Sequence, residues 1–114
     1  MTTREVGQLV ERSVVKYLQD NGFDILDMNW TCRWGEIDIV AKEGETLVFV
    51  EVKYRSSDKF GFPTDSVTYR KKKALLRAIR YYLLNNKTNV EGWRFDVVSV
   101  LGNKLSHYKS VSID

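Results

Sequence analysis

Apolar residues recur at every third or fourth position in two parts of the chain, which is the period of an amphipathic helix. The first stripe predicts a helix over Thr3–Asn21, with Thr2 or Thr3 as its N-cap and Gly22 at its end. The second stripe predicts a longer helix over Asp65–Asn86. We therefore expect two helices.

Elsewhere the apolar residues alternate with polar ones, which is typical of β-strands. Five strands are predicted, over Phe23–Arg33, Glu36–Lys42, Thr46–Tyr54, Trp93–Leu101 and Leu105–Ile113. The apolar positions of the first strand change from odd to even residue numbers near Leu26, which indicates a bulge there. Residues 55–64 contain Ser, Gly and the single Pro, so we expect a loop there. The order α-β-β-β-α-β-β predicts an α/β fold with a mixed central β-sheet flanked by helices.

The length of 114 residues favours one domain over 1–114. Cys32 is the only cysteine, which excludes an internal disulfide and a cysteine-rich zinc site and is typical of a reducing, cytoplasmic protein. Apolar runs are too short for a membrane span, so no membrane partner is expected.

Charge is divided unevenly along the chain. Residues 1–50 hold five Lys or Arg and nine Asp or Glu, whereas residues 51–114 hold thirteen Lys or Arg and six Asp or Glu. An acidic cluster beside a basic half suits a site that binds metal ions and polyanions together.

Three charged residues interrupt the strands of the predicted hairpin: Asp38 on the first strand, and Glu51 and Lys53 on the second. A two-residue turn at Gly44-Glu45 would place Asp38 opposite Glu51, and a turn at Glu43-Gly44 would place it opposite Phe49. Either turn puts the three side chains on the same face of the sheet.

Two opposed carboxylates repel each other, and a divalent cation relieves this repulsion directly. Hard ions such as Mg²⁺ or Mn²⁺ accept such oxygen ligands, so Asp38 and Glu51 are candidate metal ligands. The amine of Lys53 could act on water or on phosphate. Glu11 has no cation three or four positions away on its own helix and is a candidate supporting carboxylate. The alternative is an ordinary solvated face, with the carboxylates paired to Lys53 or Arg55.

The second helix carries a basic cluster without acidic partners three or four positions away. Unpaired cations of this kind suit contacts with a nucleic-acid backbone. The candidates for this role are Lys71, Lys72, Lys73 and Arg77, together with Arg55 after the preceding strand. The alternative is a solvated helix face.

The chain resembles the YraN family of uncharacterised bacterial proteins, from about residue 4 to residue 101. The motifs that carry the resemblance are Gly35-Glu36-Ile37-Asp38, Phe49-Val50-Glu51-Val52-Lys53-Tyr54-Arg55, Gly61-Phe62-Pro63, Lys71 and Arg94-Phe95-Asp96-Val97-Val98. That family is similar to archaeal Holliday-junction resolvases and to the wider PD-(D/E)XK nuclease superfamily. The chain departs from the family pattern at Val10 and at Ser66-Val67, and neither departure touches a candidate ligand.

The resemblance implies a restriction-endonuclease-like, three-layer domain. It implies that Asp38, Glu51 and Lys53 form the catalytic core, with Glu11 assisting from the first helix and Mg²⁺ or Mn²⁺ as cofactor. It also implies a homodimer.

The first hypothesis for function is a metal-dependent nuclease that hydrolyses DNA phosphodiester bonds, on branched or single-stranded substrates. The alternatives are a nucleic-acid-binding module that has the fold without the catalysis, and a protein-interaction domain. The intact set of Asp38, Glu51 and Lys53 favours the nuclease, because a pure binder has no need of opposed carboxylates.

Overall fold

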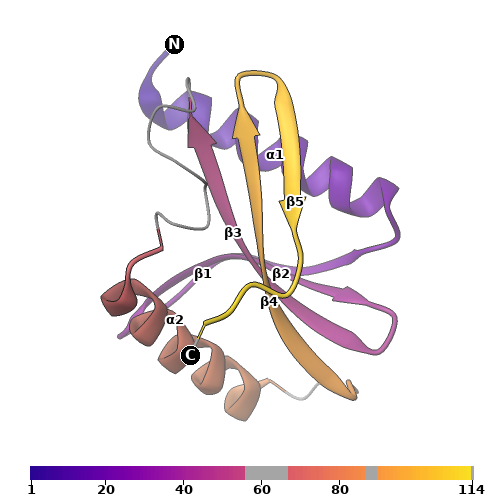
Figure 1. The fold of residues 1–114 in the computed structure, drawn as a ribbon, viewed down its shortest axis with the longest axis vertical. Helices are drawn as coiled ribbons and strands as arrows, with labels where there is room; N and C mark the ends of the chain where they lie inside the picture. Colours follow the sequence, from indigo (N-terminus) through magenta and orange to yellow (C-terminus); the bar gives the residue numbers. More distant parts are fainter. Residues whose placement is uncertain (56–66, 87–89, 114) are drawn as a thin grey trace.

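The computed structural model describes residues 1–55, 67–86 and 90–113 (Figure 1). Within these ranges, five strands form one sheet in which their spatial order is their chain order. The elements are α1 (Thr3–Asp20), β1 (Asp24–Cys32), β2 (Gly35–Glu43), β3 (Thr46–Arg55), α2 (Tyr69–Asn85), β4 (Gly92–Leu101) and β5 (Lys104–Tyr108). The predicted order of elements is confirmed.

The sheet is mixed. Strands β1, β2 and β3 pair antiparallel, as do β4 and β5, whereas β3 and β4 pair parallel along their whole lengths. Parallel neighbours need a crossover connection, and α2 lies within the one that joins β3 to β4. This crossover explains why the second helix stands between the two groups of strands in the sequence.

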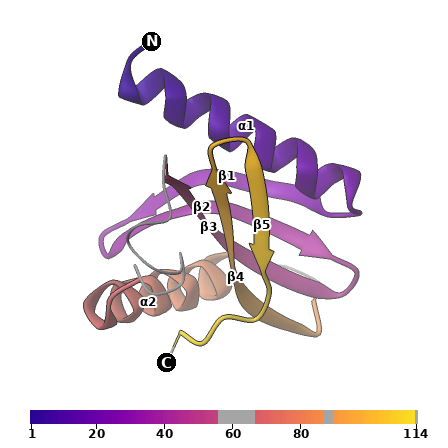
Figure 2. The same ribbon diagram turned by 45° about the horizontal axis from the view of Figure 1, so that its top comes forward.

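The two helices cover opposite faces of the sheet, which makes a three-layer domain (Figure 2). On the α1 face, Val14 and Leu18 pack with Val48, Val50 and Val98 of the central strands. The opposite face has its own core under α2, built from buried side chains that include Ile37, Phe49, Ile79, Tyr82 and Phe95. Both faces of β3 and β4 are therefore buried, as continuous Val-rich strands require.

Local chemistry sets the boundaries of α1. The hydroxyl of Thr2 accepts a hydrogen bond from the Glu5 amide, and the Glu5 carboxylate accepts one from the Thr2 amide, which is a complete capping box. Gly22 follows the helix with a φ of 87°, a left-handed conformation that glycine adopts without a steric penalty. Between Ile25 and Asp27 the register of β1 shifts, which confirms the bulge predicted near Leu26.

The predicted start of the second helix was wrong. The helix begins at Tyr69 rather than Asp65, because Thr68 has extended backbone and its hydroxyl accepts a hydrogen bond from the Lys71 amide. Val67 is buried ahead of this cap. Most of the predicted loop, together with residues 65 and 66, lies outside the described residues.

The predicted end of the last strand was also wrong, since β5 stops at Tyr108 instead of Ile113. Ser110 adopts a left-handed φ of 54°, and its amide donates to the Asp96 carboxylate instead of to a neighbouring strand. The chain then turns towards α2, where Ile113 is buried in the core. The tail therefore closes one edge of the α2 face.

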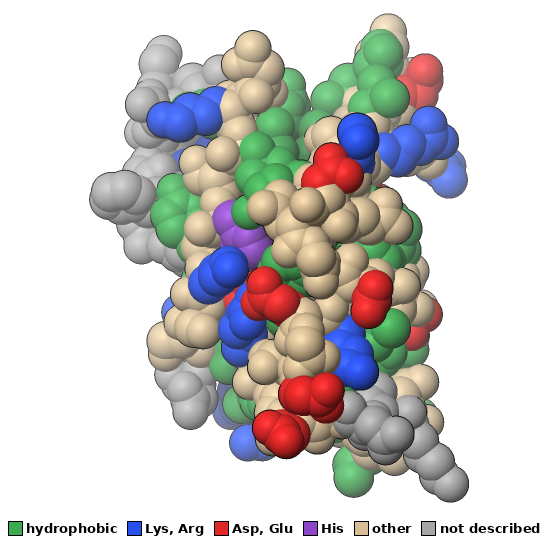
Figure 3. Space-filling view, turned by 90° about the vertical axis from the view of Figure 1, so that its right-hand side faces the viewer, with side chains coloured by type: hydrophobic (Ala, Val, Ile, Leu, Met, Phe, Trp, Pro, Cys, Tyr) green, Lys and Arg blue, Asp and Glu red, His purple; other side chains and the backbone are tan. Residues whose placement is uncertain are grey.

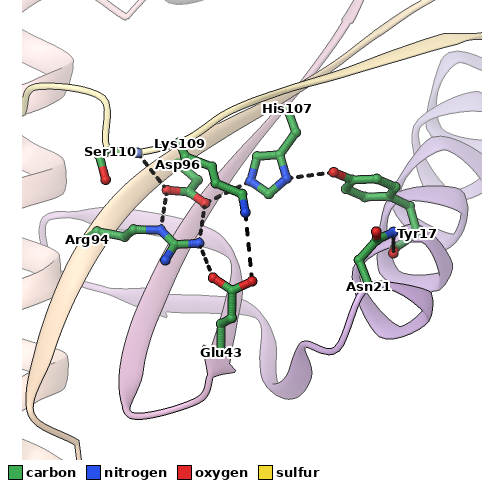
Figure 4. Close-up of polar contacts among 8 residues, drawn as sticks. All are labelled: Tyr17, Asn21, Glu43, Arg94, Asp96, His107, Lys109 and Ser110. Carbon is green, nitrogen blue, oxygen red and sulfur yellow. Dashed lines mark hydrogen bonds and ion pairs between the residues drawn. The ribbon is translucent and has the colours of Figure 1, made fainter.

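A buried polar network ties α1 to β4 and β5 (Figure 4). Asp96 is fully buried, and its carboxylate accepts hydrogen bonds from Arg94 and contacts Nε2 of His107 at 2.7 Å. The other ring nitrogen of His107, Nδ1, lies 2.8 Å from the Tyr17 hydroxyl. Burial alone would raise the pKa of Asp96, but the hydrogen bonds from His107, Arg94 and the Ser110 amide outweigh it and lower the pKa.

The network continues to the surface at the hairpin end of the sheet. Arg94 also donates to Glu43 at 2.8 Å, and the ammonium of Lys109 lies 3.8 Å from the same carboxylate. Figure 3 shows the histidine, His107, on this face with basic and acidic side chains beside it. Arg94 and Asp96 thus form an ion pair of 3.0 Å within a larger cluster.

Neither described helix is long and apolar enough to cross a membrane.

We expect Asp96→Ala to lower the free energy of unfolding by about 3–5 kcal/mol, because it leaves the buried ring of His107 and the partly buried Arg94 guanidinium without their shared partner. Urea denaturation at neutral pH measures this. The matched control is Lys109→Ala, whose half-exposed ion pair should contribute less than about 1 kcal/mol. Equal effects of the two substitutions would contradict a structural role for the network.

Candidate active site

Strands β2 and β3 separate at the point where the candidate carboxylates lie. Their pairing runs from Glu43–Thr46 to Ile39–Val50 and goes no further, although β3 continues beside β4 as far as Arg55. The Glu43–Thr46 pair shows that, of the two turns the sequence allowed, the one at Gly44-Glu45 is present, which puts Asp38 and Glu51 at the next position after the last pair. The Asp38 carboxylate accepts a hydrogen bond of 2.8 Å from the Val52 amide and so satisfies a backbone donor at the fork between the strands.

Glu51 points to the α2 face of the sheet. Its neighbours Val50 and Val52 pack with the α1-side core, and side chains alternate along a strand. The side chain of Glu51 is only 8% exposed. A carboxylate so deeply buried needs cationic partners.

Asp38 and Glu51 are close enough to disturb each other electrostatically. Burial, and next the negative charge of Glu51, raise the pKa of Asp38 to about 7, against the lowering effect of the Val52 amide. Near neutral pH this pair of carboxylates therefore holds a proton that a cation could replace.

Two ammonium groups bind the same oxygen of Glu51. The Nζ atom of Lys71 lies 2.6 Å from Oε1, and the Nζ atom of Lys53 lies 3.4 Å from it. Lys53 comes from the same strand two residues later, and Lys71 comes from the first turn of α2. The site thus joins three elements: β2, β3 and the start of α2.

The two lysines differ in their proton affinity. Burial, and then the neighbouring Lys71, lower the pKa of Lys53 in spite of Glu51. Burial also acts to lower the pKa of Lys71, but its hydrogen bond to Glu51, together with its other contacts and the negative charges of Glu51 and Asp38, outweighs burial and raises the pKa. Lys71 is therefore a firmly charged partner of Glu51, and Lys53 is the amine that gives up its proton more easily.

The donor set suits a hard divalent ion. Among the described residues no group of three or more His, Cys, Asp or Glu side chains gathers to hold a metal, which argues against a zinc-type cage in that part of the chain. Mg²⁺ in proteins is commonly held by one or two carboxylates, with water and substrate phosphate completing the coordination. Asp38 and Glu51 fit that requirement. The pKa of Asp38 is raised in part by the negative charge of Glu51, so a bound cation would relieve repulsion between the two carboxylates.

Glu11, on α1, contacts another residue instead of the two carboxylates. Its carboxylate accepts a hydrogen bond of 3.2 Å from the Asn29 amide group. Asn29 lies between the pairs Met28–Ile39 and Trp30–Ile37, which puts it across the ladder from Asp38, and it has a left-handed φ of 49°. Within the described residues, Glu11 is thus linked to the strand beside the site and makes no hydrogen bond to Asp38 or Glu51.

The other basic candidates on α2 form no ion pair with Asp38 or Glu51 within the described residues. Lys73 and Arg77 are exposed on α2, and Lys72 is half-buried there. None of these three forms an ion pair within the described part of the chain. Arg55 ends β3, where its carbonyl accepts a hydrogen bond from Gly102.

The contact between Lys71 and Glu51 was not expected from the sequence, although a signal for it exists. Lys71 precedes Leu75 by four residues and Ala78 by seven, so it lies on the buried stripe of its helix. A lysine on the stripe that faces the core implies a buried acidic partner.

Stability should depend on pH through Asp38. Below the unfolded pKa of about 4, both states are protonated and the carboxyl has no effect. Between that value and about 7 the unfolded chain loses a proton that the folded chain keeps, so stability falls as pH rises, and the whole cost remains above pH 7.

We therefore expect Asp38→Asn, which keeps an acceptor for the Val52 amide, to stabilise the fold by about 2 kcal/mol near pH 8 and to have little effect near pH 4. Urea denaturation of both proteins at the two pH values measures this. Equal stability changes at both pH values would mean that the charge of Asp38 is not the cause.

Sequence comparison identifies the relatives of the chain. The family model described as "Uncharacterised protein family UPF0102" matches residues 10–100. A UPF0102 protein of Caldicellulosiruptor saccharolyticus is 45% identical over 113 residues, covering 99% of this chain and 96% of that protein. One from Moorella thermoacetica is 47% identical over 113 residues, covering 99% and 94%.

Among solved structures, that of SSO0001 superposes with a TM-score of 0.49 at 16% sequence identity. It covers 94% of this chain, which spans 51% of that one. The sequence matches establish the family, because they extend over nearly the full length of this chain and of its relatives. The chain belongs to the uncharacterised protein family UPF0102.

Proposed function

We propose that this protein is a metal-dependent nuclease that hydrolyses phosphodiester bonds of DNA, with Asp38, Glu51 and Lys53 as its catalytic core. The observation that carries the proposal is the fork between β2 and β3, where two carboxylates lie together and two ammonium groups meet one of them. The motif resemblance to PD-(D/E)XK nucleases supports the same assignment.

Hydrolysis of a phosphodiester adds the oxygen of water to phosphorus and breaks one phosphorus–oxygen bond. Asp38 and Glu51 would hold the Mg²⁺ or Mn²⁺ ion. When bound, such an ion polarises a phosphate oxygen and lowers the pKa of water. Lys53, with its lowered pKa, is suited to take a proton from the attacking water. In its charged form it offsets negative charge that develops on the phosphate.

Lys71 has a positioning role in this proposal. Its short contact with Oε1 fixes the orientation of the Glu51 carboxylate and offsets its charge. Because Lys71 lies in the first turn of α2, the same contact joins the carboxylates to the helix that carries the basic candidates Lys72, Lys73 and Arg77. Those cations would bind the DNA backbone beside the site.

Metal binding is the first test. Titration calorimetry with Mn²⁺ should detect binding that is lost in Asp38→Ala and in Glu51→Ala, because each removes one of two protein ligands. The matched control is Glu45→Ala, which removes an exposed carboxylate in the hairpin turn. Unchanged Mn²⁺ binding in both site variants would contradict the proposed metal site.

The second test separates an enzyme from a binder. Lys53→Ala should lower cleavage of single-stranded, flapped and four-way DNA by orders of magnitude while DNA affinity changes little, because the amine acts mainly in the transition state. Lys104→Ala, which removes an exposed lysine of β5, is the control. Binding without any cleavage by the unaltered protein would favour the non-catalytic module, and absence of both would end the nucleic-acid hypothesis.

A further inference from the structure

A groove runs along α2 on the side opposite to the carboxylates. Its volume is about 380 Å³, within the range of sites that bind small ligands. It is lined by Tyr69, Lys72, Lys73, Leu76, Arg77, Arg80 and Ile113. Ile113 belongs to the carboxy-terminal tail, so the groove lies between α2 and the tail that turns back after β5.

The groove and the carboxylates use different sides of one helix. Each residue of an α-helix advances about 100° around the axis. Tyr69 is two residues before Lys71, which places it about 200° away from the lysine that binds Glu51. Ligands of the two sites would therefore be separated by roughly the width of a helix, about 10 Å.

The groove is lined by both positively charged and apolar side chains. Four of the seven lining residues are Lys or Arg, and none is acidic. Between the cations, Leu76 and Ile113 present hydrocarbon, and at one end of the groove lies Tyr69, a residue that is 79% exposed. No hydrogen bond or ring contact holds the Tyr69 side chain within the described residues, so its ring is available to a ligand.

Duplex DNA would use only the cations of this groove, because its bases are stacked and paired away from the phosphates. An unpaired strand would use both features: its phosphates meet the Lys and Arg side chains, and an unstacked base lies on an aromatic or apolar surface. The combination of charge and exposed ring thus favours a single strand over a duplex.

We propose that the groove between α2 and the tail binds an unpaired strand of nucleic acid, with a base stacked on Tyr69 and phosphates on Arg80 and its neighbouring cations. The inference rests on the proposed nuclease function and deepens it, since it names a single-stranded segment next to the cleavage site as part of the substrate. A branched or tailed DNA, with duplex and single strand side by side, satisfies this requirement.

The experiment measures the binding of a labelled oligothymidylate and of a blunt duplex of the same length by fluorescence anisotropy, in EDTA so that nothing is cut. Tyr69→Ala should weaken single-strand binding by about 5- to 100-fold, the range for loss of one stacked base, and leave duplex binding within about twofold. Leu84→Ala is the control, because it removes another exposed apolar side chain of α2 outside the groove.

A second pair of matched variants tests the cations of the groove. Arg80→Gln should weaken single-strand binding more than Arg70→Gln, since both remove one charge from α2 but only Arg80 lines the groove. Equal losses in this pair, or equal effects of Tyr69→Ala and Leu84→Ala, would overturn the proposed site. So would failure of the unaltered protein to bind the oligothymidylate.

The same variants separate this inference from the nuclease proposal. If the unaltered protein binds single strands through Tyr69 but cuts no DNA with Mg²⁺ or Mn²⁺, the groove assignment stands and the proposed catalysis fails. If it cuts DNA while Tyr69→Ala changes neither single-strand affinity nor cleavage, the groove assignment alone fails.

Discussion

The hydrogen bond from the Val52 amide to the Asp38 carboxylate determines the geometry of the candidate site. A strand that leaves its neighbour exposes an unpaired amide, and a buried amide without a partner is costly. Here a side chain supplies the acceptor, so β2 can leave β3 after the Ile39–Val50 pair while β3 remains in the sheet. The fork brings one carboxylate from each strand together and leaves them open to a third element, the first turn of α2.

Much of the fold could be predicted because it depends on local pattern. The stripe that ends in Leu18, the alternation of β3 and β4 and a two-residue turn containing Gly44 all follow from neighbouring residues, and the structure selects Gly44-Glu45 from the two turns that the sequence allowed. The errors occurred where one polar contact ended an element early. Thr68 caps α2, which therefore begins four residues after the predicted start, and Ser110 turns the chain away from the sheet although the apolar alternation continues to Ile113.

The site was predictable as a face of the sheet but not as a set of contacts. Periodicity places Asp38, Glu51 and Lys53 on one side, and the structure has them there. The partner of Glu51 that lies nearest is Lys71, twenty residues away, and the network around Asp96 depends on Tyr17 and His107 from distant elements. Such contacts depend on how the helices pack against the sheet. The hydrophobic pattern of one strand or helix carries no information about that packing. A histidine and an aspartate within apolar strands were the available hints.

The irregular backbone of β1 constrains how copies of this protein can associate. β1 is an edge strand, and a new strand can add to an edge only along a regular run of free amides and carbonyls. The bulge after Ile25 and the left-handed Asn29 interrupt that run twice, and the other edge, β5, is only five residues long. The sheet is therefore poorly suited to continue from one molecule into the next. A homodimer of this fold would have to be joined by side chains of its helices and loops, and its symmetry axis would be set by surface shape and charge instead of by a shared backbone ladder.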